Sequence, residues 1–143
     1  MRRQGSPKGR GSKALSKPAL ISIVDDDRSI RAALARLLMS LDYETEVYTS
    51  AEDFLLSDRR DVTDCLIADV RMPGMTGLEL FHRLMETGRA IPTILMTAHG
   101  SERERMIAIR AGVLCYLTKP VDGPGLMKCI SRALERLGSD VQA

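Results

Sequence analysis

Short apolar runs alternate along this chain with longer segments in which apolar residues recur every three or four positions. The runs are bounded by turn residues and most are rich in β-branched side chains, which is typical of buried strands. They cover residues 20–24, 44–48, 65–69, 92–96 and 114–118. The second run is more polar than the others, which indicates a strand near the edge of a sheet. The longer segments have the spacing of helices with one buried face, so five strands alternate with five helices.

Polar residues and glycines mark the ends of these helices. Four polar residues are predicted to cap helix N-termini: Asp27, Ser50, Thr76 and Ser101. Glu79 and Glu104 follow the last two by three positions, which is the capping-box pattern. Gly88, Gly112 and Gly138 are predicted to end the last three helices. The predicted inward face of the third helix consists of Leu78, Phe81, Leu84 and Met85. Residues 58–63 are predicted to form a charged loop.

The alternation of strands and helices predicts a parallel sheet, because consecutive parallel strands need a crossover connection and such crossovers are right-handed. Helices then cover both faces of the sheet. A chain of 143 residues suits one domain, and 44% hydrophobic residues can form its core. We therefore predict an α/β fold with a doubly wound parallel sheet over residues 19–143.

Charged and hydroxyl side chains stand at the carboxyl ends of four predicted strands: Asp25 and Asp26, then Asp69, then Thr97, then Lys119. In a doubly wound sheet these ends share the edge at which ligands bind. Carboxylates held close together repel each other unless a cation joins them, and oxygen ligands favour Mg²⁺. A carboxylate can also accept a phosphoryl group, so this edge could hold a small tetrahedral anion against a metal ion.

Cysteine usage and hydropathy narrow the class of protein. Cys65, Cys115 and Cys129 have no metal-ligand spacing and lie in apolar segments, so we predict small buried residues in a reducing compartment. No stretch approaches the ~20 apolar residues of a membrane span, and no signal peptide precedes the first strand. We therefore expect a soluble cytoplasmic protein.

The charge of the chain is unevenly distributed. Residues 1–18 carry six positive charges and no acidic residue, whereas the remainder has fifteen basic and nineteen acidic residues. The net charge of +2 thus combines a basic tail with an acidic body. A tail of Gly, Ser, Pro, Lys and Arg buries too little apolar surface to order itself, so we predict disorder. It could attract nucleic acid or anionic lipid, or be a solvated extension.

Four segments together are more specific than any one of them: Ile23–Asp27, Asp69–Gly77, Thr97-Ala98 and Lys119-Pro120. The set resembles the receiver domain of bacterial response regulators. The resemblance covers residues 19–138, and residues 97–100 are most similar to receivers that precede LuxR-type helix-turn-helix domains. It implies a flavodoxin-like (βα)5 fold with strand order 2-1-3-4-5, and a cis peptide bond between Lys119 and Pro120.

The resemblance also implies the chemistry of the phosphoryl group. Asp69 would accept it from a histidine of a sensor kinase, Thr97 would hydrogen-bond it, and Lys119 would pair with it. Small Ala98 would leave room for its approach. The protein would then be a phospho-accepting signalling switch rather than an enzyme, catalysing at most its own phosphorylation and dephosphorylation.

The same resemblance implies a metal site. Mg²⁺, with Mn²⁺ as the alternative, would be bound by Asp26, Asp69 and the backbone carbonyl of Arg71. Asp25 would act on the metal through water.

Tyr116 lies three residues before Lys119, where the family has its switch aromatic. Movement of Thr97 toward the phosphoryl group would vacate space that Tyr116 fills from outside. This would change the surface of the fourth helix, fifth strand and fifth helix, through which a homodimer or an output domain absent from this chain would be contacted. DNA would be reached through that domain or, more weakly, through the basic tail. Val121 and residues 123–125 depart from the family pattern on this surface, and a half-buried strand tyrosine is the alternative for Tyr116.

Two other classes of function fit parts of the pattern. A phosphohydrolase of the haloacid-dehalogenase type also uses a strand-end aspartate and Mg²⁺. Such enzymes normally carry a second aspartate two residues after the nucleophile, where this chain has Arg71. A nucleic-acid-binding module would use the basic tail instead. The signalling switch is favoured because it accounts for all four strand ends.

Overall fold

The computed structural model describes residues 18–142, and it describes side chains as far as residue 136. The predicted tail at residues 1–18 therefore lies, except for Pro18, outside the described residues. Within them, five parallel strands form one sheet in the order β2-β1-β3-β4-β5, as predicted. The strands are β1 (Leu20–Val24), β2 (Glu44–Tyr48), β3 (Cys65–Asp69), β4 (Thr93–Thr97) and β5 (Cys115–Thr118).

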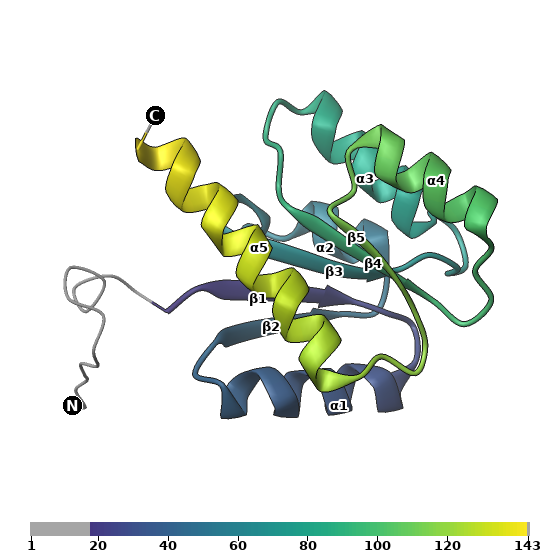
Figure 1. Cartoon of the computed structure of the whole chain (residues 1–143), viewed down its shortest axis with the longest axis horizontal. Coiled ribbons are helices and arrows are strands. Elements are labelled where there is room, and N and C mark those ends of the chain that lie inside the picture. Colours follow the sequence, from purple (N-terminus) through teal and green to yellow (C-terminus); the bar gives the residue numbers. More distant parts are fainter. Residues whose placement is uncertain (1–17, 143) are drawn as a thin grey trace.

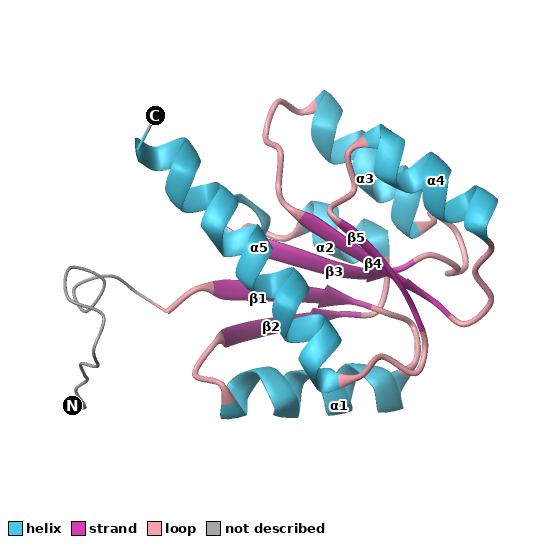
Figure 2. Ribbon diagram, in the orientation of Figure 1, coloured by secondary structure: helices cyan, strands magenta, loops and turns pink. Residues whose placement is uncertain are grey.

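Helices connect the strands and cover both faces of the sheet (Figures 1 and 2). They are α1 (Arg28–Ser40), α2 (Ala51–Leu56), α3 (Gly77–Glu86), α4 (Glu102–Ala111) and α5 (Gly123–Gln142), with a short 3₁₀ helix, η2 (Arg60–Val62). Helices α1 and α5 pack on one face, and α2, α3 and α4 pack on the other. No helix in the described part of the chain is both long enough and apolar enough to cross a membrane.

The central strand β3 contributes to a separate core on each face of the sheet. Cys65 and Ile67 belong to the core beneath α1 and α5, whereas Leu66 and Ala68 belong to the core beneath α2, α3 and α4. Successive side chains of a strand point to opposite faces, so a strand buried on both faces must be apolar throughout. This explains why an uninterrupted apolar run precedes Asp69.

Several predicted helix ends are confirmed by hydrogen bonds. The side chains of Asp27 and Ser50 cap α1 and α2. At α3 both halves of the capping box form: the Thr76 hydroxyl accepts from the Glu79 N–H at 3.1 Å, and the Glu79 carboxylate accepts from the Thr76 N–H at 2.8 Å. Gly112 ends α4 with φ of 116°, a left-handed conformation that glycine adopts without steric cost.

Four local predictions were wrong. The second capping box forms only in part, since Ser101 caps α4 but the carboxylate of Glu104 binds other partners. Met85 is 47% exposed, and Leu80 takes the inward position because it shares a face with Phe81 and Leu84.

The other two corrections concern a loop and a helix end. Residues 58–63 contain η2 rather than only irregular loop. Helix α5 continues through Gly138 to Gln142, because a glycine inside a helix costs only about 1 kcal/mol relative to alanine and does not by itself end it.

The three cysteines are buried and free, as predicted. Burial raises the pKa of the Cys65 thiol, and burial together with Cys115 raises the pKa of Cys129 to about 12. Thiols with raised pKa values are poor nucleophiles, which agrees with a packing role.

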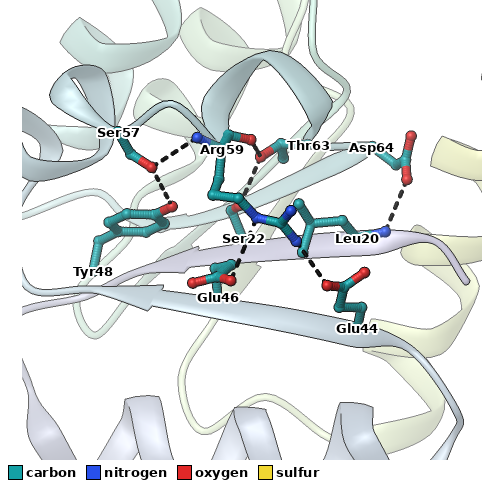
Figure 3. A network of polar contacts seen from close by, with 9 residues as sticks. All are labelled: Leu20, Ser22, Glu44, Glu46, Tyr48, Ser57, Arg59, Thr63 and Asp64. Atoms are coloured by element: carbon teal, nitrogen blue, oxygen red, sulfur yellow. Dashed lines mark hydrogen bonds and ion pairs between the residues drawn. The ribbon is translucent and has the colours of Figure 1, made fainter.

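A polar network ties the edge strand β2 to the chain that enters β3 (Figure 3). The hydroxyls of Ser22 and Thr63 lie 2.7 Å apart and both residues are fully buried. The Thr63 hydroxyl also donates to the carbonyl of Arg59 at 3.0 Å, and the Arg59 guanidinium pairs with Glu44 at 2.7 Å and with Glu46 at 3.5 Å. In this network hydroxyls lie against hydrogen-bond partners and the guanidinium lies against carboxylates.

Candidate functional site

Asp25 is the most deeply buried acidic residue at the carboxyl edge of the sheet. It follows β1 directly, and its backbone N–H donates to the carbonyl of Tyr48 at 3.2 Å. Its side chain is completely buried. One carboxylate oxygen accepts from the Asp27 N–H at 2.9 Å and the other from the Lys119 ammonium at 3.1 Å. The turn that starts α1 therefore fixes the position of the carboxylate.

Asp69 ends β3 beside Asp25, and its residue exposure is only 6%. Its Oδ1 accepts from the backbone N–H of Arg71 at 3.2 Å. A Cβ atom on Gly77 would lie 2.4 Å from the carbonyl oxygen of Asp69, so α3 starts in direct contact with the backbone of this residue. Glycine is required there by space, and the close packing fixes the strand end on which the carboxylate stands.

Lys119 joins the two buried acids. Its Nζ lies 3.1 Å from Asp25 Oδ2 and 3.3 Å from Asp69 Oδ2. The backbone N–H of Lys119 donates to the carbonyl of Thr97 at 2.7 Å, which ties the end of β5 to the end of β4. The peptide bond between Lys119 and Pro120 is cis, as the resemblance implied.

The site contains more carboxylates than the single ammonium group of Lys119 can neutralise. Burial raises the pKa of Asp69, and the neighbouring Asp25 raises it further, whereas Lys119 lowers it in part. Burial acts to lower the pKa of Lys119, but its hydrogen bond to Asp25 and the charges of Asp25 and Asp69 outweigh that effect and raise it. The site as a whole therefore favours an additional cation.

The geometry of the donors fits such a cation. Ligand oxygens of Asp25, Asp26 and Asp69 all lie within 4.8 Å of one another, and Asp26 is exposed to solvent. Carboxylate oxygens with one side open to water are suited to Mg²⁺, which binds few protein carboxylates and retains several waters. The residues present thus fit the metal that the sequence predicted.

Thr97 and Tyr116 occupy the other half of the edge. Thr97 is completely buried at the end of β4, and its hydroxyl oxygen accepts from the His99 N–H at 3.3 Å. Tyr116 is half-buried on β5, one strand away. A Cβ atom on Gly100 would lie 2.8 Å from the Thr97 methyl group and 3.0 Å from the Tyr116 ring, so the two side chains meet around this glycine.

Glu104 also lies at this edge, although no sequence pattern indicated it. Its carboxylate accepts from the Tyr116 hydroxyl at 3.2 Å and from the Arg71 guanidinium at 2.9 and 3.2 Å. Burial and the contact with Glu104 raise the pKa of Tyr116. The predicted capping box concealed this role, because it assigned the same carboxylate to the backbone of its own helix. The site residues that were predicted from the sequence lie at the carboxyl edge or in the loops that leave it.

The family described as response regulator receiver domain matches residues 21–131. The chain is a response regulator receiver domain. Five parallel strands in the order 2-1-3-4-5, with an acidic cluster at their carboxyl ends, agree with that membership. Receiver domains are signalling switches of two-component systems.

Curated relatives of this receiver are longer than the chain. Response regulator protein TodT of Pseudomonas putida is 38% identical over 119 residues, which cover 83% of this chain and 52% of TodT. Transcriptional regulatory protein GlrR of Escherichia coli is 37% identical over 120 residues, which cover 84% of this chain and 27% of GlrR. The chain thus spans about half the length of TodT and less of GlrR.

A solved structure supports the same assignment. The crystal structure of FixJ-N is 33% identical and superposes with a TM-score of 0.75, covering 84% of this receiver and 96% of that chain. The similarity therefore extends over nearly the whole of that solved chain.

Proposed function

We propose that Asp69 of this receiver accepts a phosphoryl group from a phosphohistidine of a sensor kinase in a Mg²⁺-dependent reaction. The observation that supports this role most directly is the position of its carboxylate. Asp69 lies at a strand end beside a second buried acid, Asp25, and the Lys119 ammonium contacts both carboxylates, at 3.3 Å from Asp69 Oδ2. An oxygen of this carboxylate would form a bond to phosphorus as the bond from phosphorus to the histidine nitrogen breaks. The freed imidazole nitrogen then takes a proton from solvent.

The side chains around Asp69 serve to position and neutralise the transferred group rather than to react with it. Lys119 supplies a fixed ammonium beside the accepting oxygen. Thr97 supplies a hydroxyl once it turns from His99 toward the phosphoryl oxygens. Asp25, Asp26 and Asp69, with the backbone carbonyl of Arg71, would hold Mg²⁺ (or Mn²⁺). The metal ion would neutralise charge on the phosphoryl oxygens.

We further propose that phosphorylation changes the surface formed by α4, β5 and α5 through Thr97 and Tyr116. This surface would bind a second copy of the receiver, an output domain or a protein target, and DNA would be contacted through such a domain. The presence of transcriptional regulatory protein GlrR among the relatives supports this direction. We place the receiver domain at residues 19–143, expect it in the cytoplasm, and expect no reaction on an external substrate.

The proposal is tested by intact mass after incubation with a small phosphodonor and Mg²⁺. We expect a gain of one phosphoryl group that is lost in Asp69→Asn and on chelation of the metal. Asp61→Asn is a matched control, because Asp61 is exposed in η2 and pairs only with its neighbour Arg60 among the described ion pairs. A normal gain in Asp69→Asn would show that another residue accepts the group.

A further inference from the structure

Glu104 links two parts of the switch that are far apart in the sequence. Its carboxylate receives two hydrogen bonds from Arg71, in the loop that leaves Asp69, and one from the hydroxyl of Tyr116 on β5. Arg71 and Glu104 are separated by 33 positions in the chain. The loop that follows the proposed phospho-acceptor is therefore connected by hydrogen bonds, through one carboxylate, to the proposed switch residue.

The contact of Glu104 with Arg71 and Tyr116 replaces the capping-box hydrogen bond that the equivalent residue of α3 makes. Glu79 and Glu104 occupy the same position relative to their caps, Thr76 and Ser101. The Glu79 carboxylate turns back and accepts from the backbone N–H of Thr76 at 2.8 Å. Glu104 is instead directed toward Arg71 and Tyr116, and the hydrogen bonds found for it lie there. Both glutamates could accept a hydrogen bond from the backbone of their own N-cap residue. The contacts with Arg71 and Tyr116 therefore account for the different orientation of Glu104.

The loop after β4 is part of the same arrangement. Arg71 also donates to the carbonyl of His99 at 3.4 Å, and the N–H of His99 donates to the Thr97 hydroxyl at 3.3 Å. The Thr97 methyl group and the Tyr116 ring both lie against Gly100. A movement of the Thr97 hydroxyl toward Asp69 would therefore disturb the contacts that Arg71 makes with Glu104.

From these contacts we infer that Glu104 is a positioning residue of the switch, which holds Arg71 and the Tyr116 hydroxyl in the arrangement seen here and opposes phosphorylation. The inference rests on the proposed function of Asp69. Phosphorylation draws Thr97 toward Asp69, and Tyr116 follows only when its hydroxyl leaves Glu104. Removing the carboxylate of Glu104 removes that restraint and increases the fraction of molecules competent to be phosphorylated.

The size of the effect follows from the exposure of the pair. The side chains of Arg71 and Glu104 are 57% and 41% exposed, and ion pairs this exposed are weak. An exposed pair is expected to bias a two-state equilibrium by about 1.5- to 5-fold. The bias decreases as salt screens the charges.

The first test compares initial phosphorylation rates of the full chain with a small phosphodonor and Mg²⁺. We expect Glu104→Gln to react about 1.5- to 5-fold faster than wild type at low salt. Glu102→Gln is the matched control, since it makes the same change on the same helix but removes only a pair with Arg105 at 2.7 Å. It is expected to react at the wild-type rate. Equal rates for the two variants, or a slower rate for Glu104→Gln, would overturn the inference.

The second test follows the titration of Tyr116 by NMR of ring-labelled tyrosine, with the signal assigned by Tyr116→Phe. Glu104→Gln should lower the pKa of Tyr116, whereas Glu102→Gln should leave it unchanged. An unchanged pKa in Glu104→Gln would also overturn the inference. If wild type gains no phosphoryl group on Asp69, the proposed function fails and this inference with it. If wild type is phosphorylated but Glu104→Gln behaves like Glu102→Gln, only the role of Glu104 fails.

Discussion

Two polar clusters of this receiver differ in how far their charged groups are exposed to water. In the network of Figure 3, every interaction joins complementary groups: Ser22 with Thr63, and Arg59 with Glu44. At the carboxyl edge, two buried carboxylates share the ammonium of Lys119. The two glutamates that share the Arg59 guanidinium are 45% and 41% exposed, so water screens their charge, and Arg59 Nε is buried without a hydrogen bond. The two carboxylates that share Lys119 are instead buried, which leaves their excess negative charge unscreened.

The difference distinguishes a group that stabilises the fold from one that binds a ligand. A hydrogen bond between two buried polar groups, such as the hydroxyls of Ser22 and Thr63, lowers the free energy of the folded state and needs no ligand. A cluster of like charges costs stability, and it persists where a cation or a transferred group can complete it. Substitutions in the first cluster should therefore destabilise the fold without slowing phosphorylation, whereas substitutions at the carboxyl edge should impair phosphorylation.

The largest effect is expected at Lys119. Replacing it with Met removes the ammonium that lies 3.3 Å from Asp69 and that would pair with the phosphoryl group. Removal of one preorganised charge from a transition state typically costs about 10²- to 10³-fold in rate. We expect the initial rate of phosphorylation by a small donor to fall by that order.

Lys128→Met serves as the control for this prediction, because Lys128 is exposed on α5 and the substitution is the same. It should keep the wild-type rate. A Lys119→Met protein that is folded by circular dichroism and reacts as fast as Lys128→Met would contradict a role for Lys119 in the reaction.

The next largest effect is expected on the stability of the network in Figure 3. Thr63→Val leaves the fully buried hydroxyl of Ser22 without its partner at 2.7 Å. An unsatisfied buried hydroxyl costs about 1–3 kcal/mol, and removal of both partners costs less. Urea unfolding should show this loss in Thr63→Val and a partial recovery in Ser22→Ala/Thr63→Val. Both proteins should be phosphorylated at the wild-type rate. A slower rate under conditions in which the variants are fully folded would show that the two clusters do not act independently.

Replacement of Asp69 is expected to have a smaller effect on the free energy of unfolding, and to raise it rather than lower it. Because its pKa is raised above the ordinary value of 3.8, the folded protein holds this proton more tightly than the unfolded chain does. The resulting stability is present below pH ~4 and is lost as pH rises through the raised pKa. Without metal, Asp69→Asn should therefore be more stable than wild type at neutral pH, and the advantage should shrink toward pH 4.

Mg²⁺ provides the control for that comparison. At ten times its dissociation constant, the metal should stabilise wild type by about 1.4 kcal/mol through mass action. Asp69→Asn, which lacks one proposed ligand, should gain less. Urea unfolding at several pH values measures both effects, and a wild-type protein that is the more stable of the two at neutral pH without metal would refute the prediction.

The smallest effect on the free energy of unfolding is expected for the exposed ion pair in the network of Figure 3. The Arg59–Glu44 pair has side chains 39% and 45% exposed, so it should contribute at most about 1 kcal/mol. Glu44→Gln should lower the free energy of unfolding by this amount or less, and added salt should reduce the difference. A loss as large as that of Thr63→Val would show that the exposed pair and the buried hydroxyls act as one unit.

The fold could be predicted because its signals are local. Every strand except the more polar β2 is a short apolar run, and Asp27, Ser50 and Thr76 cap helices through hydrogen bonds to residues three positions away. At the start of α4 the prediction failed because a tertiary contact competes with a local one. Glu104 had the same local option as Glu79, and the choice between them depends on residues from other elements.

The acidic site could be predicted for a similar reason. Parallel strands bring their carboxyl ends to one edge, so Asp25, Asp69 and Lys119 were expected to meet before any distance was known. The link from Arg71 through Glu104 to Tyr116 follows no such rule. It depends on how α4 is positioned against the loop that leaves β3, and that position is set by packing between elements.

We propose that Asp69, rather than a neighbouring acid, carries the phosphoryl group. After reaction with a small phosphodonor and Mg²⁺, borohydride converts an aspartyl phosphate to homoserine, and peptide mass spectrometry then locates the converted residue. We predict conversion at Asp69, with Asp25 and Asp26 unchanged. Conversion at Asp25 or Asp26, or a phosphorylated protein in which all three remain aspartate, would contradict the account.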